Sequence, residues 1–208
     1  MQLTTILTVV AGLANVALAL PVPAPLPAPP GIPSASSARS SLSGLTVRSS
    51  GSMTGYSRDE FPHWISSGGC STRETVLARD GSNVVQDSSC AATSGTWRSP
   101  YDGATQTSAS DIDIDHMVPL ANAWISGANS WTEARRREFA NDLNSPQLWA
   151  VTASVNRAKS DSPPNTWKPP LTSFHCTYAR GWIAVKAKFG LSVTSAESSA
   201  LGDMLDTC

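Results

Sequence analysis

Apolar and polar residues alternate most regularly at residues 111–115, where Asp and Ile take turns. A period of two predicts a β-strand with one apolar face. Pro119 follows shortly afterwards and suits the first turn of a helix, where its missing amide hydrogen has no partner to lose. That helix is expected to end near residue 126. A short apolar run at residues 148–151 predicts a second strand.

Capping patterns predict where three other helices begin. A Ser or Thr followed three residues later by Glu forms a capping box, in which the two side chains bind free backbone amides of the first turn. Such pairs predict helices that start at Ser71, Ser130 and Thr194 and end near residues 79, 141 and 206.

Two more helices and two short strands complete the expected elements. One helix ends at Lys159 and is capped by Thr152 or Ser154, and another covers residues 176–188 before Gly190. The strands are expected at residues 84–86 and 96–98. Together the elements predict an α+β domain over residues 53–208. Its expected core is Ile112, Ile114, Val118, Leu148, Val151, Trp182, Val185 and Leu201.

The first 52 residues differ from the rest in composition. Residues 1–19 predict a secretory signal peptide, because an apolar run ends in the small-x-small pattern Ala17-Leu18-Ala19. A membrane anchor is the alternative, but the run is short for a bilayer span and has no basic flank. Residues 20–52 are rich in Pro, Ala and Ser, so we expect a mobile linker or pro-segment that can be removed without loss of folding.

The four cysteines are Cys70, Cys90, Cys176 and Cys208. An even number in a secreted chain indicates two disulfides, for which the sequence allows three pairings. Pairing Cys70 with Cys90 and Cys176 with Cys208 is preferred, because each bond then closes one local segment. A zinc site is not indicated, since there is no Cys-x-x-Cys and the His residues lie far apart in sequence.

Charge argues against a protein whose main role is to coat nucleic acid. The chain has 15 Lys and Arg against 16 Asp and Glu, and only Arg39 and Arg48 precede residue 53. The domain is therefore slightly acidic, whereas proteins that wrap nucleic acid are usually basic. An enzyme that needs only transient phosphate contacts is compatible with this balance. The run Arg135-Arg136-Arg137 is interpreted as a solvated helix face rather than a nucleic-acid track.

Asp115 and His116 lie where the predicted strand meets the next helix, and they are the most distinctive pair in the chain. An imidazole titrates near neutral pH and can act as a general base. A second polar group, Asn156-Arg157-Ala158-Lys159-Ser160-Asp161, follows on a predicted helix. There Lys159 lies one turn after Asn156 and could reach a phosphate. Asp115 and Asn156 offer oxygen ligands, which select Mg²⁺, Mn²⁺ or Ca²⁺ over Zn²⁺.

These two groups together resemble the ββα-metal finger of HNH endonucleases. In that motif Asp-His-x-x-Pro ends the first strand, and a helix after the second strand bears Asn-Arg-x-Lys. The motifs Asp-His-x-x-Pro and Asn-Arg-x-Lys-Ser-Asp are similar to those of the HNH domain of CRISPR effector nucleases. The pattern over residues 55–208 resembles secreted HNH proteins of fungi and actinobacteria, related to the C-terminal domain of GmrSD restriction enzymes. The other matching segments are Phe61-Pro62-His63-Trp64-Ile65, Thr72-Arg73-Glu74, Gly95-Thr96-Trp97, Tyr101-Asp102-Gly103, Val118-Pro119-Leu120-Ala121-Asn122-Ala123-Trp124 and Phe139-Ala140-Asn141-Asp142.

The resemblance implies an α+β fold with a ββα-metal finger embedded in a small helix-rich domain that two disulfides staple. It implies His116 as the general base that activates water. It also implies Asp115 and Asn156 as ligands of a divalent cation, Mg²⁺ or Mn²⁺ in preference to Ca²⁺. Asn156 stands where the last, name-giving His of the family would be.

The resemblance implies further roles around the same site. The middle Asn of the motif, which orients the His, maps onto Asn144 or, as second choice, onto Asn141. Arg157 and Lys159 are interpreted as phosphate-binding residues. His63 and His175 are interpreted as packed, structural histidines.

The preferred interpretation is a secreted, monomeric, metal-dependent nuclease of low sequence specificity. It is expected to act on DNA in preference to RNA and to have no membrane partner. One alternative is a secreted binding or effector protein built on a degenerate HNH finger. Another is a hydrolase that uses Ser and His, but the chain lacks the Gly-x-Ser-x-Gly elbow that would place the nucleophile.

Overall fold

The computed structural model describes residues 28–208. The expected signal peptide at residues 1–19 and the start of the expected linker, residues 20–27, lie outside the described residues. The strands are β1 (Ser66–Ser67), β2 (Cys70–Ser71), β3 (Ser82–Gln86), β4 (Ala92–Arg98), β5 (Thr105–Gln106), β6 (Ile112–His116) and β7 (Leu148–Thr152). The helices are α1 (Ala35–Gly44), α2 (Thr72–Asp80), α3 (Leu120–Ile125), α4 (Glu133–Ala140), α5 (Ala153–Lys159), α6 (His175–Phe189) and α7 (Ser195–Leu205). Short 3-10 turns are η1 (Arg58–Glu60), η2 (Ala109–Asp111), η3 (Ala128–Ser130) and η4 (Thr172–Phe174).

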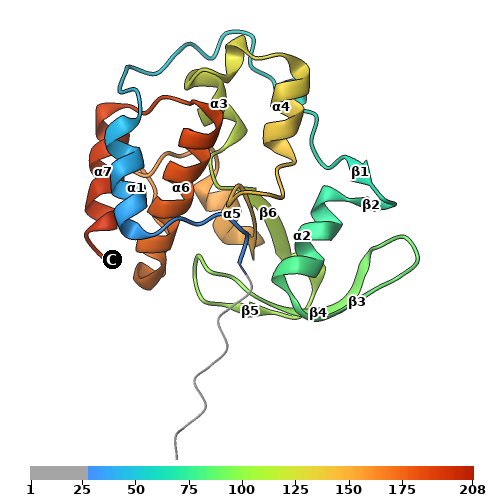
Figure 1. Ribbon diagram of the computed structural model, residues 1–208. Helices are drawn as coiled ribbons and strands as arrows, with labels where there is room; N and C mark the ends of the chain where they lie inside the picture. The colour runs from blue at the N-terminus through green and yellow to red at the C-terminus, as the bar shows by residue number, and fades with distance from the viewer. Residues whose placement is uncertain (1–27) are drawn as a thin grey trace, which may run out of the picture.

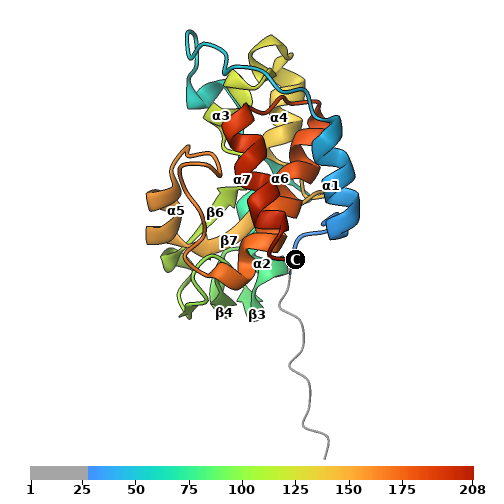
Figure 2. The same cartoon turned by 90° about the vertical axis from the view of Figure 1, so that its left-hand side faces the viewer.

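The strand pair β6–β7 lies between a helical layer and a smaller layer of strands (Figure 1). Helices α1, α6 and α7 pack together on one side, as Figure 2 also shows. On the other side α2 packs against β6 and β7 and joins the sheet β3–β4–β5. The α+β class predicted from the sequence is therefore confirmed.

The alternation of β6 explains why it carries both core and polar side chains. Ile112 and Ile114 point into a small apolar cluster with Val76 and Leu77 of α2. The residues between them project from the opposite face, as the pleat of a strand requires. On that face Asp115 is opposite Trp149 in the antiparallel register of β6 with β7. All eight predicted core residues are buried, so the apolar pattern located the core correctly.

Helix boundaries follow the predicted caps with one exception. The capping boxes that open α2 and α7 are both present. Gly190 ends α6 in the left-handed conformation. The start of α4 is the exception, because Ser130 belongs to the turn η3 and Thr132 caps the helix by accepting a hydrogen bond from the Arg135 amide. The structure thus corrects the predicted cap by two positions.

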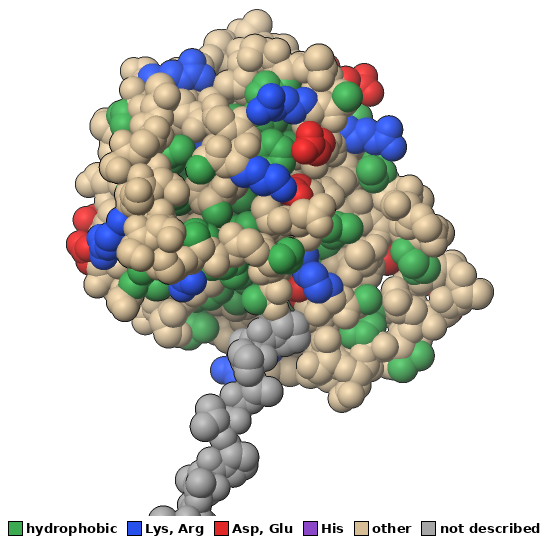
Figure 3. Space-filling model, in the orientation of Figure 1, with side chains coloured by type: hydrophobic (Ala, Val, Ile, Leu, Met, Phe, Trp, Pro, Cys, Tyr) green, Lys and Arg blue, Asp and Glu red, His purple; other side chains and the backbone are tan. Residues whose placement is uncertain are grey.

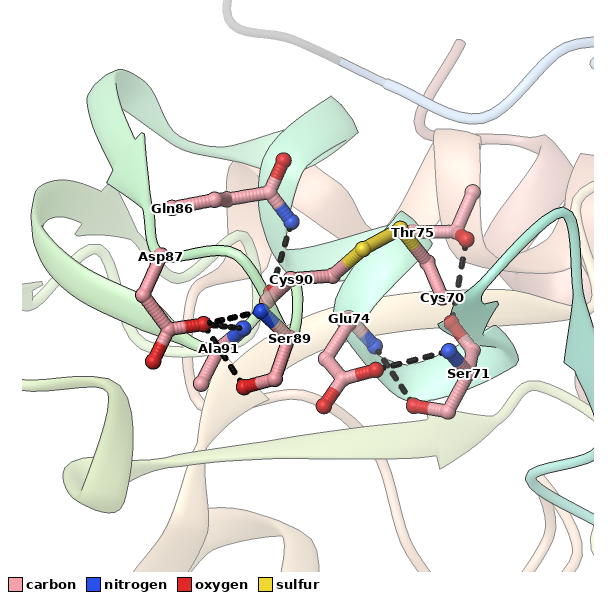
Figure 4. The surroundings of a disulfide bond; sticks show 9 residues. All are labelled: Cys70, Ser71, Glu74, Thr75, Gln86, Asp87, Ser89, Cys90 and Ala91. Carbon is pink, nitrogen blue, oxygen red and sulfur yellow. Dashed lines mark hydrogen bonds between the residues drawn. A yellow bond between two sulfur atoms is a disulfide. The ribbon is translucent and has the colours of Figure 1, made fainter.

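Both preferred disulfides are present, Cys70–Cys90 and Cys176–Cys208, and the described residues contain no free cysteine. Cys70–Cys90 joins the start of α2 to the loop between β3 and β4 (Figure 4). In that loop the Asp87 carboxylate accepts hydrogen bonds from the amides of Ser89 and Ala91 and from the Ser89 hydroxyl. The disulfide and this carboxylate together fix a hairpin that extends away from the body of the molecule.

The expected mobile linker at residues 20–52 is wrong for its described part. Residues 35–44 form α1, which is capped by Ser34 and packs against α6 and α7. Ala38 is fully buried, and Leu42 and Leu45 pack partly buried against the main core. These three residues have a helical spacing, but the intervening serines hide the apolar stripe in the sequence.

The chain after α1 is also held in place. Val47 forms a parallel bridge with Val193, and the Arg48 guanidinium donates to the Ser192 hydroxyl over 2.7 Å. The Gly51 amide donates to the carbonyl of Ile125 over 2.8 Å. The described chain before residue 53 is therefore an integral part of the domain. Among the helices of residues 28–208, none has the length and apolar character needed to cross a bilayer.

Candidate functional site

A cavity of about 300 Å³ opens at the end of β6, where β6, the start of α3 and the end of α5 meet. The antiparallel register sets Thr152, at the end of β7, beside Ile112 at the start of β6, and α5 follows directly. From there α5 runs back along β6, so that Lys159 in its last turn reaches Asp115. This arrangement brings the two polar groups of the sequence to one place. The lining residues are Arg58, Ile114, Asp115, His116, Pro119, Leu120, Asn156, Arg157, Ser160 and Asp161.

His116 is held in one orientation and one protonation state. Only 4% of its surface is exposed, and its Nε2 lies 2.9 Å from the carbonyl oxygen of Ala140. Because a carbonyl can only accept, Nε2 carries the proton and Nδ1 keeps its lone pair. The ring of Trp64 covers the imidazole, with 5.3 Å between ring centroids and 31° between planes.

Burial lowers the pKa of His116 to about 3, and the positive charge of Arg58 adds to this effect. The Ala140 carbonyl opposes the shift but does not overcome it. His116 is therefore neutral near pH 7. Among the described residues, Nδ1 has no hydrogen-bond partner, so it can accept a proton from a molecule bound in the cavity.

The group that orients His116 is a backbone carbonyl rather than the expected Asn side chain. Asn144 lines a different cavity of about 440 Å³, and its backbone amide donates to the carboxylate of Asp142. The structure therefore does not bring Asn144 to His116. The Asn141 side chain instead accepts from the Ile65 amide and donates to the carbonyl of Pro62, which braces the loop that carries Trp64.

Asp115 and Lys159 form a buried ion pair, with exposed fractions of 5% and 0%. The Lys159 ammonium lies 2.9 and 2.7 Å from the two carboxylate oxygens. It also donates to the carbonyls of His116 and Met117, and the Tyr101 hydroxyl donates to Asp115. Lys159 was expected to reach a phosphate, but its ammonium is turned inward to Asp115.

Burial acts on both members of this pair. It raises the pKa of Asp115 and lowers the pKa of Lys159. The attraction between the two charges and their hydrogen bonds opposes both shifts. The ammonium thereby neutralises the carboxylate and fixes the corner between β6 and α3.

The α5 residues differ in what they offer to the cavity. Asn156 donates through Nδ2 to Asp113 over 3.3 Å, which leaves its carbonyl oxygen without a partner among the described residues. Arg157 is exposed and has neither a carboxylate nor a carbonyl acceptor within residues 28–208. Asp161, which lies just beyond α5, adds an exposed carboxylate to the lining.

The donors available for a cation are few. Within residues 28–208, no group of three or more His, Cys, Asp or Glu side chains could hold a metal ion. Asp115 and the Asn156 carbonyl oxygen nevertheless line the same cavity. This oxygen set fits Mg²⁺, which commonly keeps several waters and takes one or two protein ligands. It does not fit the tetrahedral nitrogen and sulfur sites of Zn²⁺.

Comparison with known proteins places the chain in a family. Residues 75–204 match the family model of the C-terminal domain of GmrSD restriction endonucleases. The chain belongs to this family. It is also 66% identical over 190 residues to an "Uncharacterized secreted protein" of Arthroderma benhamiae, which covers 91% of this chain and 93% of that protein. No solved structure matches the chain.

Membership of the GmrSD C-terminal domain family confirms the resemblance seen in the sequence and indicates a nuclease-related protein that contacts nucleic acid. The disulfides and the secreted relative agree on location, and the protein is secreted and extracellular. The family match begins after the segment that carries Arg58, His63 and Trp64. The cavity of His116 is therefore lined in part by a segment outside the residues that the family model matches.

Sequence reasoning missed Arg58 and Trp64, although both lie at the site. Arg58 opens the short turn η1 and Trp64 lies in the irregular backbone that follows, where no periodicity marks a functional position. Trp64 has a positive φ of 56°, which is rare for a residue with a side chain and is common at functional sites. His63 and His175 are half-buried, and each has a ring nitrogen within hydrogen-bond distance of a nearby carbonyl oxygen.

The Arg run of α4 is only partly a solvated face. Arg135 donates to the carbonyl of Phe189, and Arg136 pairs with Glu60. Only Arg137 lacks a protein acceptor within residues 28–208, and it lines the 440 Å³ cavity. Figure 3 shows basic and acidic side chains interspersed on one face of the molecule, with no continuous basic track there.

Proposed function

We propose that this secreted protein is a divalent-metal-dependent nuclease that hydrolyses phosphodiester bonds with low sequence specificity. The observation that carries the proposal is the state of His116. Its Nε2 proton is bound to Ala140, its Nδ1 has no partner among the described residues, and it lines a polar cavity with Arg157 and Asn156. A neutral imidazole with a free ring nitrogen can accept a proton from water.

The chain's own residues divide the work as follows. His116 accepts the proton of the attacking water at Nδ1, and the Ala140 carbonyl keeps the ring in place as the positive charge develops. Arg157 binds a non-bridging oxygen of the phosphate, a task for which a guanidinium is well shaped. Asp115 and Asn156 would hold the cation, which supplies neutralisation of charge on the phosphate and the leaving oxygen. In this scheme β6, β7 and α5 act as a ββα-metal finger.

Lys159 has a supporting role in the proposal. A carboxylate buried without a partner tends to take up a proton, and a protonated Asp115 would be a poor metal ligand. The Lys159 ammonium and the Tyr101 hydroxyl favour the ionised form.

The decisive experiment is a nicking assay on supercoiled plasmid and on RNA, in Mg²⁺, in Mn²⁺ and in EDTA. The parent protein should cleave in a divalent cation and not in EDTA. His116→Ala should lower the rate by about 10²–10⁴, the usual contribution of a general base. His175→Ala is the matched control, because His175 bonds the carbonyl of Pro169 and does not line the cavity of His116. Equal rates for His116→Ala and the parent would remove the basis of the proposal.

One observation favours a second candidate. Asp115, the carboxylate expected to bind metal, is already neutralised by Lys159. A binding or effector protein on a degenerate finger would have such a site. It would show no cleavage in any cation while still binding nucleic acid or protein, and the same assay separates the two functions.

A further inference from the structure

Arg58 differs from most arginines of the chain in having no acidic or carbonyl partner. Most of the others donate to carboxylates, carbonyls or a hydroxyl. Within residues 28–208, those without such an acceptor are Arg58, Arg98, Arg137 and Arg157. Two of these four, Arg58 and Arg157, line the cavity of His116, whereas Arg98 and Arg137 each line another cavity.

Arg58 is nevertheless held in a defined position. Its Nε lies 3.3 Å from Nε2 of His63. His63 Nδ1 lies 2.8 Å from the carbonyl oxygen of Phe61, so Nδ1 carries the proton and Nε2 accepts from Arg58. Phe61 is fully buried. A chain of hydrogen bonds therefore connects the core to the guanidinium and leaves both terminal Nη groups of Arg58 without a partner among the described residues.

The segment around Arg58 is anchored on both sides. Arg136 binds the carbonyl and the carboxylate of Glu60, and Asn141 binds the carbonyl of Pro62. An exposed arginine usually loses much conformational freedom when it binds a ligand. Here part of that freedom is already lost, which favours binding by the fixed guanidinium.

The charges around the cavity select an anion. Arg58 and Arg157 contribute two positive charges. Asp115 is balanced by Lys159, so Asp161 is the one lining carboxylate without an ion-pair partner in the described residues. A guanidinium with two free Nη groups matches the oxygens of a phosphodiester.

We propose that Arg58 is a second phosphate-binding residue of this site, that it donates from its Nη groups to the phosphodiester being cleaved, and that His63 positions it. The inference rests on the proposed nuclease function and deepens it. It assigns a substrate contact to the segment that precedes the residues matched by the family model.

The first test measures binding without cleavage. A fluorescent single-stranded DNA oligonucleotide is titrated with full-length protein carrying His116→Ala, in Mg²⁺ and at several salt concentrations. Adding Arg58→Ala should weaken binding about 10- to 100-fold, the range for one charge-assisted hydrogen bond. It should also reduce the slope of log K against log salt by about 0.7, the contribution of one phosphate contact on a single strand. Arg98→Ala and Arg137→Ala are matched controls and should change neither quantity.

The second test measures cleavage in the His116 parent. Arg58→Ala should lower kcat/KM about 10- to 100-fold by the same reasoning, with an unchanged melting temperature. Arg58→Lys keeps the charge but cannot reproduce the bond to His63 together with two Nη contacts. It should therefore keep the salt slope and recover only part of the rate. His63→Ala should resemble Arg58→Lys.

The outcomes separate this inference from the proposed function. If the parent cleaves and Arg58→Ala matches the Arg98→Ala control in rate and salt slope, the role of Arg58 is refuted and the nuclease stands. If the parent does not cleave but Arg58→Ala still reduces the salt slope, the nuclease is refuted and the phosphate contact stands. If His63→Ala has no effect while Arg58→Ala does, the positioning role of His63 is refuted.

Discussion

His116 links the stability of the domain to pH. The neutral imidazole is buried, and protonation of it in the folded state is strongly disfavoured. In the unfolded chain the same residue takes up a proton near its ordinary pKa of 6.5. The unfolded state therefore binds more protons between about pH 6.5 and about pH 3, and stability must fall as pH falls through this window.

This predicts a pH-dependent difference between the parent and His116→Gln. From pH 7 to pH 5 the unfolding free energy of the parent should fall by about 2 kcal/mol more than that of the variant, because each pH unit within the window costs about 1.4 kcal/mol. Urea unfolding at the two pH values measures the difference. His175→Gln serves as control and should follow the parent. Parallel behaviour of parent and His116→Gln would contradict a buried, neutral His116.

The ion pair of Asp115 and Lys159 predicts a large mutational effect. Lys159→Met leaves a buried carboxylate without its ammonium, and we expect it to lower the unfolding free energy by about 3–5 kcal/mol. Lys168→Met changes an exposed residue and should cost less than about 0.5 kcal/mol. The double variant Asp115→Asn/Lys159→Met should regain part of the loss, since no charge is then left unpaired. Denaturant melts decide, and equal costs for the two Lys variants would exclude a structural pair.

At the level of elements, helix α1 is the part of the fold that the sequence concealed. It has no acidic residue in its first turn and no basic residue in its last, and its apolar stripe is short. Its stability must come from packing against α6 and α7, because an isolated helix of this length is marginal in water. A composition rich in Ser and Pro was therefore a poor guide to order.

A pair of substitutions tests whether α1 belongs to the core. Ala38→Glu places a charge at a fully buried position and should lower the unfolding free energy by about 2–4 kcal/mol. Ser40→Glu adds the same charge on the exposed face and should have an effect within about 0.5 kcal/mol. Thermal or urea unfolding provides the measurement. If both variants melt like the parent, α1 does not contribute to stability.

The elements that sequence analysis did find share a simple property. Their signals are local: the alternation of β6, the capping boxes of α2 and α7, and Gly190 after α6. The residues of the site were predictable only where a local motif marked them. Asp115, His116 and Asn156, which were expected to share a site, do line one cavity, because two motifs bracketed a strand pair.

The sequence could not show in which direction a side chain points or which backbone groups contact the site. Whether Lys159 points to solvent or to Asp115 depends on how α5 packs on β6, which no spacing reveals. The Ala140 carbonyl that holds His116 has no side-chain signature. Arg58 enters the site from the short turn η1, far in sequence from either motif. Each of these is a tertiary contact rather than a property of local sequence.

For the whole molecule, the two disulfides connect peripheral parts to the core, and neither lines the cavity of His116. Replacing Cys176 and Cys208 by Ser should lower the unfolding free energy by about 3–4 kcal/mol in the chain-entropy model. Cleavage measured well below the melting temperature should remain. Replacing Cys70 and Cys90 by Ser gives a comparison with a shorter loop. Loss of cleavage in a folded double variant would show that the disulfide also shapes the site.

The contact of α1 with α6 and α7 sets the order in which the chain can become native during synthesis. The first of these helices is synthesised well before its two neighbours, so its apolar stripe stays uncovered until they follow. Pairings between distant parts of a chain are slow to form, because the connecting loop must first be closed. The Cys176–Cys208 link likewise needs a residue that lies beyond α7. The helical layer can therefore be completed only after α7 has been synthesised, and a chain that stops short of it exposes the apolar stripe of α1 to aggregation.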